Sequence, residues 1–188
     1  EAQSSAVIMD KNGAVLAIVG GRGEKSSDRI FNLATQMLRS PGSVIKPVSV
    51  YAPAIDRKLI TWATVFDDIP TKITKLSNGN YSLWPKNNPR IYSGLTTVNQ
   101  AIKSSTNTVA VNVLEKLGKE NSFMFLRDTI GISTLVEKEN KTDGGYLSDI
   151  AEAPLALGAL SRGASLLEMT AAYTMFPSSG ICSSPHFY

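Results

Sequence analysis

Ser43 and Lys46 form the first residue pair in this sequence that could perform covalent chemistry. A spacing of three residues places both side chains on one face of a helix, one turn apart. A serine hydroxyl is a weak nucleophile until a neighbouring base removes its proton. A lysine can be that base when burial and a helix N-terminus lower its pKa. The pair taken alone is also consistent with a helix-capping serine beside a solvated lysine.

Ser105 and Asn107 form a second polar pair. Residues two apart do not share a helix face, so these two side chains can act together only at a loop or a helix end. There, Ser105 could relay a proton between Lys46 and a leaving amine, while the amide of Asn107 holds a substrate carbonyl. The alternative interpretation is a polar junction before the apolar helix face that starts at 108–111.

The elements that must position these residues can be predicted from turn and cap signals. Two apolar runs within 5–21 flank Asn12-Gly13, which predicts an antiparallel β-hairpin. A helix is expected over 44–58, and it must begin at or just before Ser43 because Pro47 is tolerated only in a first helical turn. Further helices are expected over 98–117 and 120–130, ended by Gly118 and Gly131.

The remaining segments give weaker signals. Residues 61–92 contain three prolines and look irregular. A capping box formed by Ser165 and Glu168 predicts a helix that runs to about 176. Aromatic and methionine residues in 123–125 and 173–176 fit the core faces of helices. We find no internal repeat and no linker that would split the chain.

Composition restricts the class of protein. The 188 residues are 43% hydrophobic and 19% charged, which is typical of a globular domain large enough to bury its own core. The single cysteine, Cys182, excludes an intrachain disulfide and a cysteine-built zinc site. A net charge of +3 without a basic run argues against nucleic-acid binding, and no metal or cofactor is expected. His186 has no partner pattern and is expected at the surface.

The order of motifs along the chain is more specific than any single motif. The region around Ser43 contains Gly20-Gly21, Phe31-Asn32-Leu33-Ala34-Thr35-Gln36 and Arg39-Ser40-Pro41-Gly42-Ser43-Val44-Ile45-Lys46-Pro47. Downstream lie Trp84-Pro85-Lys86-Asn87, Gly94-Leu95-Thr96, Ala101-Ile102, Ser105-Thr106-Asn107, Leu155-Ala156-Leu157-Gly158 and Glu168-Met169-Thr170-Ala171-Ala172-Tyr173. This series, nearly end to end, resembles the transpeptidase domain of penicillin-binding proteins, and it is nearest to the bifunctional class A enzymes.

The resemblance implies a D,D-transpeptidase of peptidoglycan synthesis that β-lactam antibiotics inhibit. It implies that Ser43 is the nucleophile that attacks stem peptides ending in D-Ala-D-Ala, with Lys46 as its base and Ser105 as the proton relay. Asn107, Trp84 and Asn87 are the implied substrate-binding residues. The implied location is the extracytoplasmic face of the bacterial cell membrane, reached through an N-terminal anchor that this sequence does not contain.

The resemblance also implies an α+β fold, an antiparallel sheet flanked by helices, of which residues 1–188 would be an incomplete N-terminal portion. Within it we expect the hairpin 5–21 and a mostly helical part over 43–176. The family's Lys-Thr-Gly motif is not matched, because Lys141-Thr142-Asp143-Gly144 has an aspartate in the glycine position and lies in a polar loop. The rest of the domain would then be absent, or would be a second chain that binds as a partner.

Two other functions use the same residues or the same fold. A serine β-lactamase or a β-lactam sensor domain shares the serine–lysine chemistry, but a lactamase needs a base for deacylation and no glutamate stands in a suggestive motif. A non-catalytic domain that retains the fold is the third interpretation. The joint presence of Ser43, Lys46, Ser105 and Asn107 argues against it.

The unmatched Lys-Thr-Gly motif leads to the first prediction. We expect the 188-residue chain alone to release D-Ala from a stem-peptide substrate weakly or not at all, because the strand that carries this motif supplies an oxyanion donor and binds the substrate carboxylate in the family. Release of D-Ala by the isolated chain, verified by mass, is the measurement. Full activity would contradict the prediction.

Overall fold

The computed structural model describes residues 2–25 and 27–187 of the chain, which fold into two compact units. Unit 1 comprises Glu1–Pro41, Met124–Asp149 and Leu160–Tyr188, and unit 2 comprises Gly42–Phe123 and Ile150–Ala159. Each unit is assembled from separated stretches of sequence. The chain therefore passes between the units more than once, which explains why the sequence contains no recognisable linker.

Unit 2 begins with the helical segment that carries Ser43 and Lys46. A 3-10 turn, η1 (Gly42–Ile45), leads through Lys46 into a π-helical turn, η2 (Pro47–Tyr51), and then into α1 (Ala52–Asp56). The expected helix start is confirmed, but the helix is not regular. Pro53 has no N–H to donate to the carbonyl of Ser49, and the hydroxyl of Ser122 donates to that carbonyl instead, at 2.7 Å.

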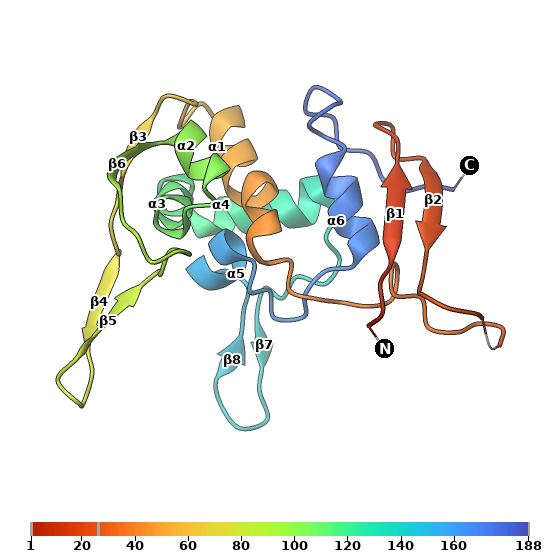
Figure 1. Cartoon of the computed structure of the whole chain (residues 1–188), viewed down its shortest axis with the longest axis horizontal. Helices are drawn as coiled ribbons and strands as arrows, with labels where there is room; N and C mark the ends of the chain where they lie inside the picture. Colours follow the sequence, from red (N-terminus) through yellow and green to blue (C-terminus); the bar gives the residue numbers. More distant parts are fainter. Residues whose placement is uncertain (1, 26, 188) are drawn as a thin grey trace. The chain divides into compact units, whose positions relative to one another are not determined.

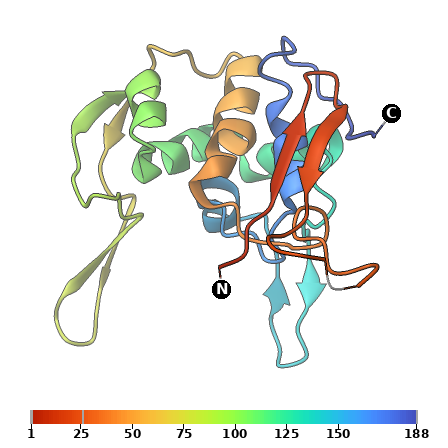
Figure 2. The same ribbon diagram turned by 45° about the vertical axis from the view of Figure 1, so that its right-hand side comes forward.

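The core of unit 2 forms around α3 (Asn107–Leu117), which packs against η2, α1 and α5 (Glu152–Leu157) (Figures 1 and 2). A single helix was expected over 98–117. The structure instead has α2 (Val98–Lys103), a break at 104–106 and then α3. Gly118 ends α3 with a φ of 87°, as expected, and α4 (Lys119–Met124) follows. The largest buried side chains here are those of Ile45, Val48, Val98, Leu114, Phe123 and Leu155.

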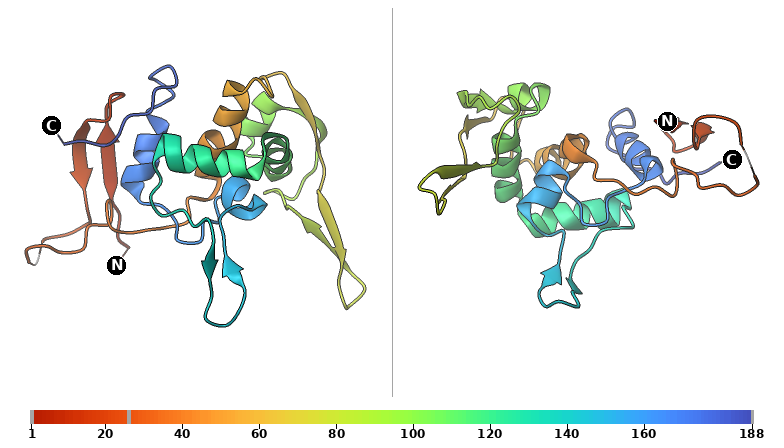
Figure 3. Two further views of the ribbon diagram at one scale, coloured as in Figure 1. Left: turned by 180° about the vertical axis from the view of Figure 1, so that it is seen from behind. Right: turned by 60° about the horizontal axis from the view of Figure 1, so that its bottom comes forward.

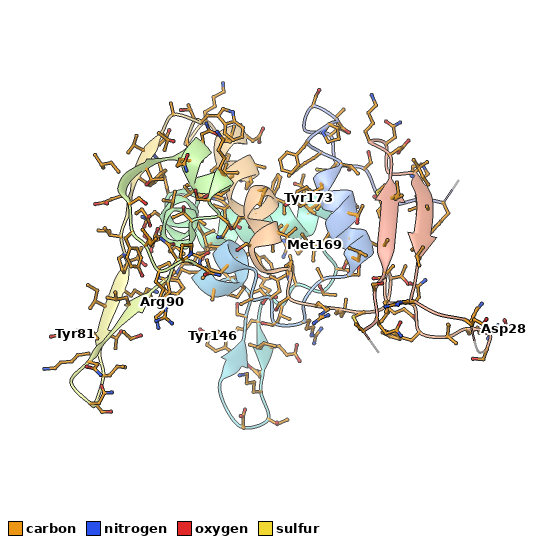
Figure 4. The ribbon with its side chains drawn as sticks, in the orientation of Figure 1. Asp28, Tyr81, Arg90, Tyr146, Met169 and Tyr173 are labelled. Atoms are coloured by element: carbon orange, nitrogen blue, oxygen red, sulfur yellow. The ribbon has the colours of Figure 1, made fainter. Side chains whose placement is uncertain are left out.

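The expectation that 61–92 is irregular is wrong. β3 (Val65–Asp68) pairs antiparallel with β6 (Gly94–Thr97), and β4 (Lys72–Lys75) pairs antiparallel with β5 (Tyr81–Trp84). Gly79, with a φ of 83°, lies in the turn of the β4–β5 hairpin. The pair Asn78-Gly79 is therefore a hairpin signal in the sequence that the prediction for 61–92 did not use. Each strand has only four residues, which is too few for alternation to stand out beside prolines. Tyr81 projects from this hairpin (Figure 4).

Unit 1 contains the expected N-terminal hairpin, formed by β1 (Ala6–Met9) and β2 (Val15–Val19). It also holds η3 (Phe125–Ile130), α6 (Leu166–Tyr173) and a second hairpin of β7 (Glu139–Asn140) and β8 (Tyr146–Leu147), whose strands can be followed in Figure 3. Gly131 ends η3 in the left-handed conformation, as expected. The described strands pair two by two and antiparallel, so the α+β class is confirmed.

The capping box that the sequence predicted is present at the start of α6. The hydroxyl of Ser165 accepts from the backbone N–H of Glu168, and the Glu168 carboxyl accepts from the backbone N–H of Ser165. Glu168 also accepts from the N–H and hydroxyl of Ser133. Burial alone would raise the pKa of Glu168, but the hydrogen bonds from Ser165 and Ser133 outweigh it and lower the pKa.

Ser165→Ala is expected to destabilise the protein by about 1 kcal/mol, because the cap hydroxyl is lost while the partly buried N–H of Glu168 stays without its partner. Urea unfolding followed by circular dichroism measures the change. Ser4→Ala, at an exposed serine of the same unit, is the matched control and should leave the unfolding midpoint in place. Equal midpoints for Ser165→Ala and Ser4→Ala would show that the box contributes nothing.

Candidate active site

Ser43 lies in the first helical turn of unit 2 with an exposed side chain. Lys46 follows η1 directly, three residues after Ser43, so the two side chains lie on the same face of the helical segment, one turn apart. Within the part of the chain that the structure describes, the Ser43 hydroxyl makes no hydrogen bond. The predicted nucleophile is therefore accessible, and its hydroxyl does not cap the helix.

Gly158 fixes the position of this turn. Its carbonyl accepts a hydrogen bond from the Gly42 N–H at 3.3 Å, and a Cβ on Gly158 would lie 2.1 Å from the Gly42 carbonyl oxygen. Gly158 also has a φ of 73°, which a residue with a side chain rarely adopts. This role of Gly158 was not predicted from the sequence. Its signal was a glycine directly after an apolar helix, which is typical of a helix end rather than of a close approach.

Lys46 is buried, with 2% of its surface exposed. Its Nζ donates to the Ser105 carbonyl at 2.6 Å, to the Ser105 hydroxyl at 3.2 Å and to Oδ1 of Asn107 at 2.5 Å. The three acceptors match the three donors of an ammonium group. Residues that are about 60 positions apart in the sequence are thus brought together, as the sequence analysis predicted.

Ser105 adopts the left-handed conformation, with a φ of 53°. Its N–H donates to the Ile102 carbonyl and the N–H of Thr106 donates to the Ala101 carbonyl, which is the Schellman pattern at the end of α2. Glycine usually occupies this position, and a serine there costs about 1–2 kcal/mol. The strained conformation turns both oxygens of Ser105 toward Lys46, so the predicted need for a helix end at this motif is confirmed.

Asn107 begins α3, and both polar atoms of its side chain have partners. Oδ1 accepts from Lys46, and Nδ2 donates to the Lys86 carbonyl at 2.6 Å. Lys86 lies in the segment that follows β5, so the Trp84-to-Asn87 run and the Ser105-to-Asn107 run are adjacent in the fold. The two motifs were singled out separately in the sequence, and their direct contact was not foreseen.

Trp84 and Asn87, the other predicted substrate contacts, occupy different environments. Trp84 is half-buried at the end of β5, and the ammonium of Lys72 lies 4.9 Å from its ring centre. Asn87 is only 8% exposed, and all of its hydrogen-bonding positions are used within the chain. A cavity of about 210 Å³ lies between the segment 87–93 and the turn at 104–106. Substrate contacts by Trp84 and Asn87 stay predictions.

Burial lowers the pKa of Lys46 to about 8, well below its ordinary value of 10.5. Near neutral pH a measurable share of the lysine is then uncharged. A neutral amine has a lone pair that accepts a proton, and the hydroxyl of Ser105 lies 3.2 Å from Nζ. A lysine with this pKa has the property that a base for serine requires, and the role of Lys46 as the base for Ser43 stays a prediction.

The residues set aside in the sequence analysis lie in unit 1. Lys141 and Gly144 belong to the polar turn between β7 and β8, where the N–H of Gly144 donates to the Lys141 carbonyl. Burial raises the pKa of the Cys182 thiol, and His186 is exposed. Residues 2–25 and 27–187 contain no group of three acidic, histidine or cysteine side chains placed to hold a metal. In the same residues no helix has the length and apolarity to cross a membrane.

Comparison with known proteins identifies the family. The family profile described as penicillin binding protein transpeptidase domain matches residues 4–188. The chain belongs to this family. Penicillin-binding protein 1A of Clostridium botulinum strain Hall is 38% identical over 191 residues, which cover 99% of this chain and 22% of that protein. Penicillin-binding protein 4 of Bacillus subtilis is 34% identical over 183 residues, or 97% of this chain and 26% of that protein.

Solved structures show the same transpeptidase fold. Penicillin-Binding Protein 1A from Haemophilus influenzae superposes with a TM-score of 0.75 at 30% identity, over 98% of this chain and 24% of that one. PonA1 from Mycobacterium tuberculosis gives a TM-score of 0.70 at 23% identity and supports the fold alone. This penicillin-binding transpeptidase sequence spans about a quarter of the length of the curated relatives it matches.

The lowered pKa of Lys46 predicts a pH-dependent stability. Between pH 8 and 10.5 the unfolded chain binds more protons at this residue than the folded chain, so the free energy of unfolding rises with pH across that window, by about 3 kcal/mol in total. Below pH 8 both states are protonated and the cost of burying the charge is fully present. Urea unfolding at pH 7.5, 9 and 10.5 (about the edges and middle of that window) measures the slope.

Lys46→Met, which keeps the length of the side chain and cannot titrate, should lack this rise. Lys103→Met, at an exposed lysine of α2, is the control and should keep it. Identical pH slopes in the wild type and Lys46→Met would contradict the lowered pKa.

Proposed function

We propose that this domain is a D,D-transpeptidase that cross-links peptidoglycan stem peptides through an acyl-enzyme on Ser43. The observation that carries the proposal is the buried amine of Lys46, held by Ser105 and Asn107 one helical turn from an exposed serine. Membership of the transpeptidase family supports the reaction class.

We assign these groups the following roles in the acylation step. The hydroxyl of Ser43 attacks the carbonyl carbon of the penultimate D-Ala, and its proton passes to the neutral Nζ of Lys46. The peptide C–N bond then breaks, and the departing D-Ala amine receives a proton that Ser105 relays from Lys46. An ester between Ser43 and the stem peptide remains.

In the second step the amine of a neighbouring stem peptide attacks the ester carbonyl. It loses a proton through the same Ser105–Lys46 pair, and Ser43 regains its proton as the ester bond breaks. We assign Nδ2 of Asn107 to the substrate carbonyl, for which it would exchange its present acceptor, the Lys86 carbonyl. Trp84 and Asn87 are assigned to the wall of the substrate groove.

A β-lactam would acylate Ser43 in the same way, but its ring-opened leaving group stays attached and the ester persists. The substrate assigns the domain to the outer face of the bacterial cytoplasmic membrane, where stem peptides are found. β-Lactamase activity is the alternative within the same chemistry, and a non-catalytic role is the alternative outside it.

Incubation of the protein with benzylpenicillin is expected to give a single stable adduct on the peptide that contains Ser43, detected by intact mass and peptide mapping. Ser43→Ala should give none. Ser40→Ala, at an exposed serine in the same peptide region, is the matched control and should be acylated at the wild-type rate. Lys46→Met should slow acylation by about 100-fold or more, the usual loss when a general base is removed.

The other outcomes separate the alternatives. Rapid turnover of a chromogenic cephalosporin, with no adduct remaining, would indicate a β-lactamase. An unchanged mass of the full-length protein after long exposure, with the protein folded by circular dichroism, would contradict the proposed nucleophile and favour a non-catalytic role. An unchanged mass of the 188-residue chain alone would agree with the weak activity expected of that chain.

A further inference from the structure

Asp68, at the end of β3, is a buried carboxyl group with 3% of its surface exposed. Its partners are all donors: Nδ2 of Asn87 at 2.7 Å, the N–H of Ser93 at 2.9 Å and the hydroxyl of Thr108. Within residues 2–25 and 27–187 it forms no ion pair. Hydrogen bonds must compensate the desolvation of a buried acidic group. The three donors around Asp68 supply this compensation, and each of them in turn requires an acceptor at this position.

The carboxyl of Asp68, together with the Ile91 carbonyl, fixes which way the amide of Asn87 faces. An asparagine amide can be turned by 180° with little change in shape, and its partners alone decide its orientation. Because Asp68 only accepts, Nδ2 of Asn87 must face it, with its second hydrogen donated to the Ile91 carbonyl at 3.0 Å. Oδ1 of Asn87 is then directed to the opposite side.

On that side lies the N-terminus of α3. Oδ1 of Asn87 accepts from the N–H of Asn107 at 2.9 Å and from the N–H of Thr108 at 3.4 Å. The first N–H groups of a helix have no partner within the helix, and the residue at the cap position, Thr106, supplies no side-chain hydrogen bond here. Asn87 therefore caps α3 from another part of the chain, and the residue it fixes at the first turn is Asn107.

We infer that Asp68 is a positioning residue for the reaction: through Asn87 it holds the start of α3 so that Asn107 and Ser105 stay in contact with Lys46. Asp68 and Asn87 touch none of the reacting atoms in this chain of contacts. The hydroxyl of Thr108 ties the first turn of α3 directly to the same carboxyl. The inference rests on the proposed function for its kinetic consequence, and on the hydrogen bonds alone for its structural one.

The structural consequence can be measured without catalysis, by amide hydrogen exchange resolved by NMR. In the wild-type protein the amides of Asn107 and Thr108 should be protected, although first-turn amides of a helix normally exchange quickly. Asp68→Asn keeps the shape of the side chain, but places an NH₂ group against either the Asn87 amide or the Ser93 N–H. It should speed exchange at both amides about tenfold or more, the factor that corresponds to the loss of one or two hydrogen bonds.

The kinetic consequence is measured as the rate constant of benzylpenicillin acylation at saturating antibiotic, kept separate from the fraction of protein that reacts. Loss of folded protein lowers the reactive fraction and leaves the rate constant unchanged. Displacement of Asn107 lowers the rate constant itself, by about tenfold or more in Asp68→Asn, in line with the cost of a misplaced catalytic contact.

Matched variants isolate the role of the network. Thr108→Val, which keeps the shape and loses the hydroxyl, should lower the acylation rate constant, and Thr108→Ser, which keeps the hydroxyl, should restore most of it. Asp67→Asn makes the same substitution at an exposed carboxyl of the same strand, outside the network, and should leave both the rate constant and the two amides unchanged.

The outcomes are distinct. If wild-type protein is not acylated, the proposed function fails, while faster amide exchange in Asp68→Asn still supports the positioning role of Asp68. Unchanged exchange in Asp68→Asn overturns the inference whatever the kinetics. Faster exchange with an unchanged acylation rate constant also overturns it, because the network would then serve the fold alone.

Discussion

The burial of the Lys46 amine is the interaction on which the arrangement of unit 2 depends. An ammonium group with 2% exposure has lost its water, and the loss is tolerable only because Ser105 and Asn107 supply three oxygen acceptors. The same loss of water lowers the pKa of Lys46 to about 8, so the burial of the amine also makes its uncharged form available near neutral pH. A solvated lysine at this position would stay protonated near neutral pH and could not accept a proton from serine.

Three departures from the local rules of protein structure lie around this amine. Ser105 stands where a helix end normally has glycine, and Thr106 begins α3 without capping it. The helical segment that follows Lys46 has a π turn, Pro47–Tyr51, just before Pro53. Each departure has a compensating contact in unit 2, from Lys46, Asn87 and Ser122 respectively. Violations of local preference that cluster at one place and are compensated there are characteristic of functional sites.

The sequence predicted the parts of this site that depend on local spacing. The serine–lysine pair and the helix start before Pro47 follow from residues close together in the chain. At Ser105 the two-residue spacing to Asn107 required a helix end for joint action, but the helical periodicity predicted one unbroken helix over 98–117, which is wrong. The antiparallel strands of 61–92 were missed because they are four residues long, and their pairing is decided by Asn78-Gly79 and by β6 rather than by alternation. No single-sequence pattern could have paired Gly158 with Gly42, since that contact depends on how α5 approaches η1.

Two constraints hold the two sides of the site independently. On the side of Ser43, the backbone of Gly158 packs against Gly42 so closely that no side chain fits, which fixes the position of the turn that contains Ser43. On the other side, the acceptors of Lys46 are held by side chains, through Asn87 and Asp68. Backbone packing resists displacement but cannot be adjusted, whereas a hydrogen-bond network can reorganise when a partner changes. Binding of a substrate carbonyl to Asn107 would therefore be accommodated on the Asp68 side, while Ser43 stays in place.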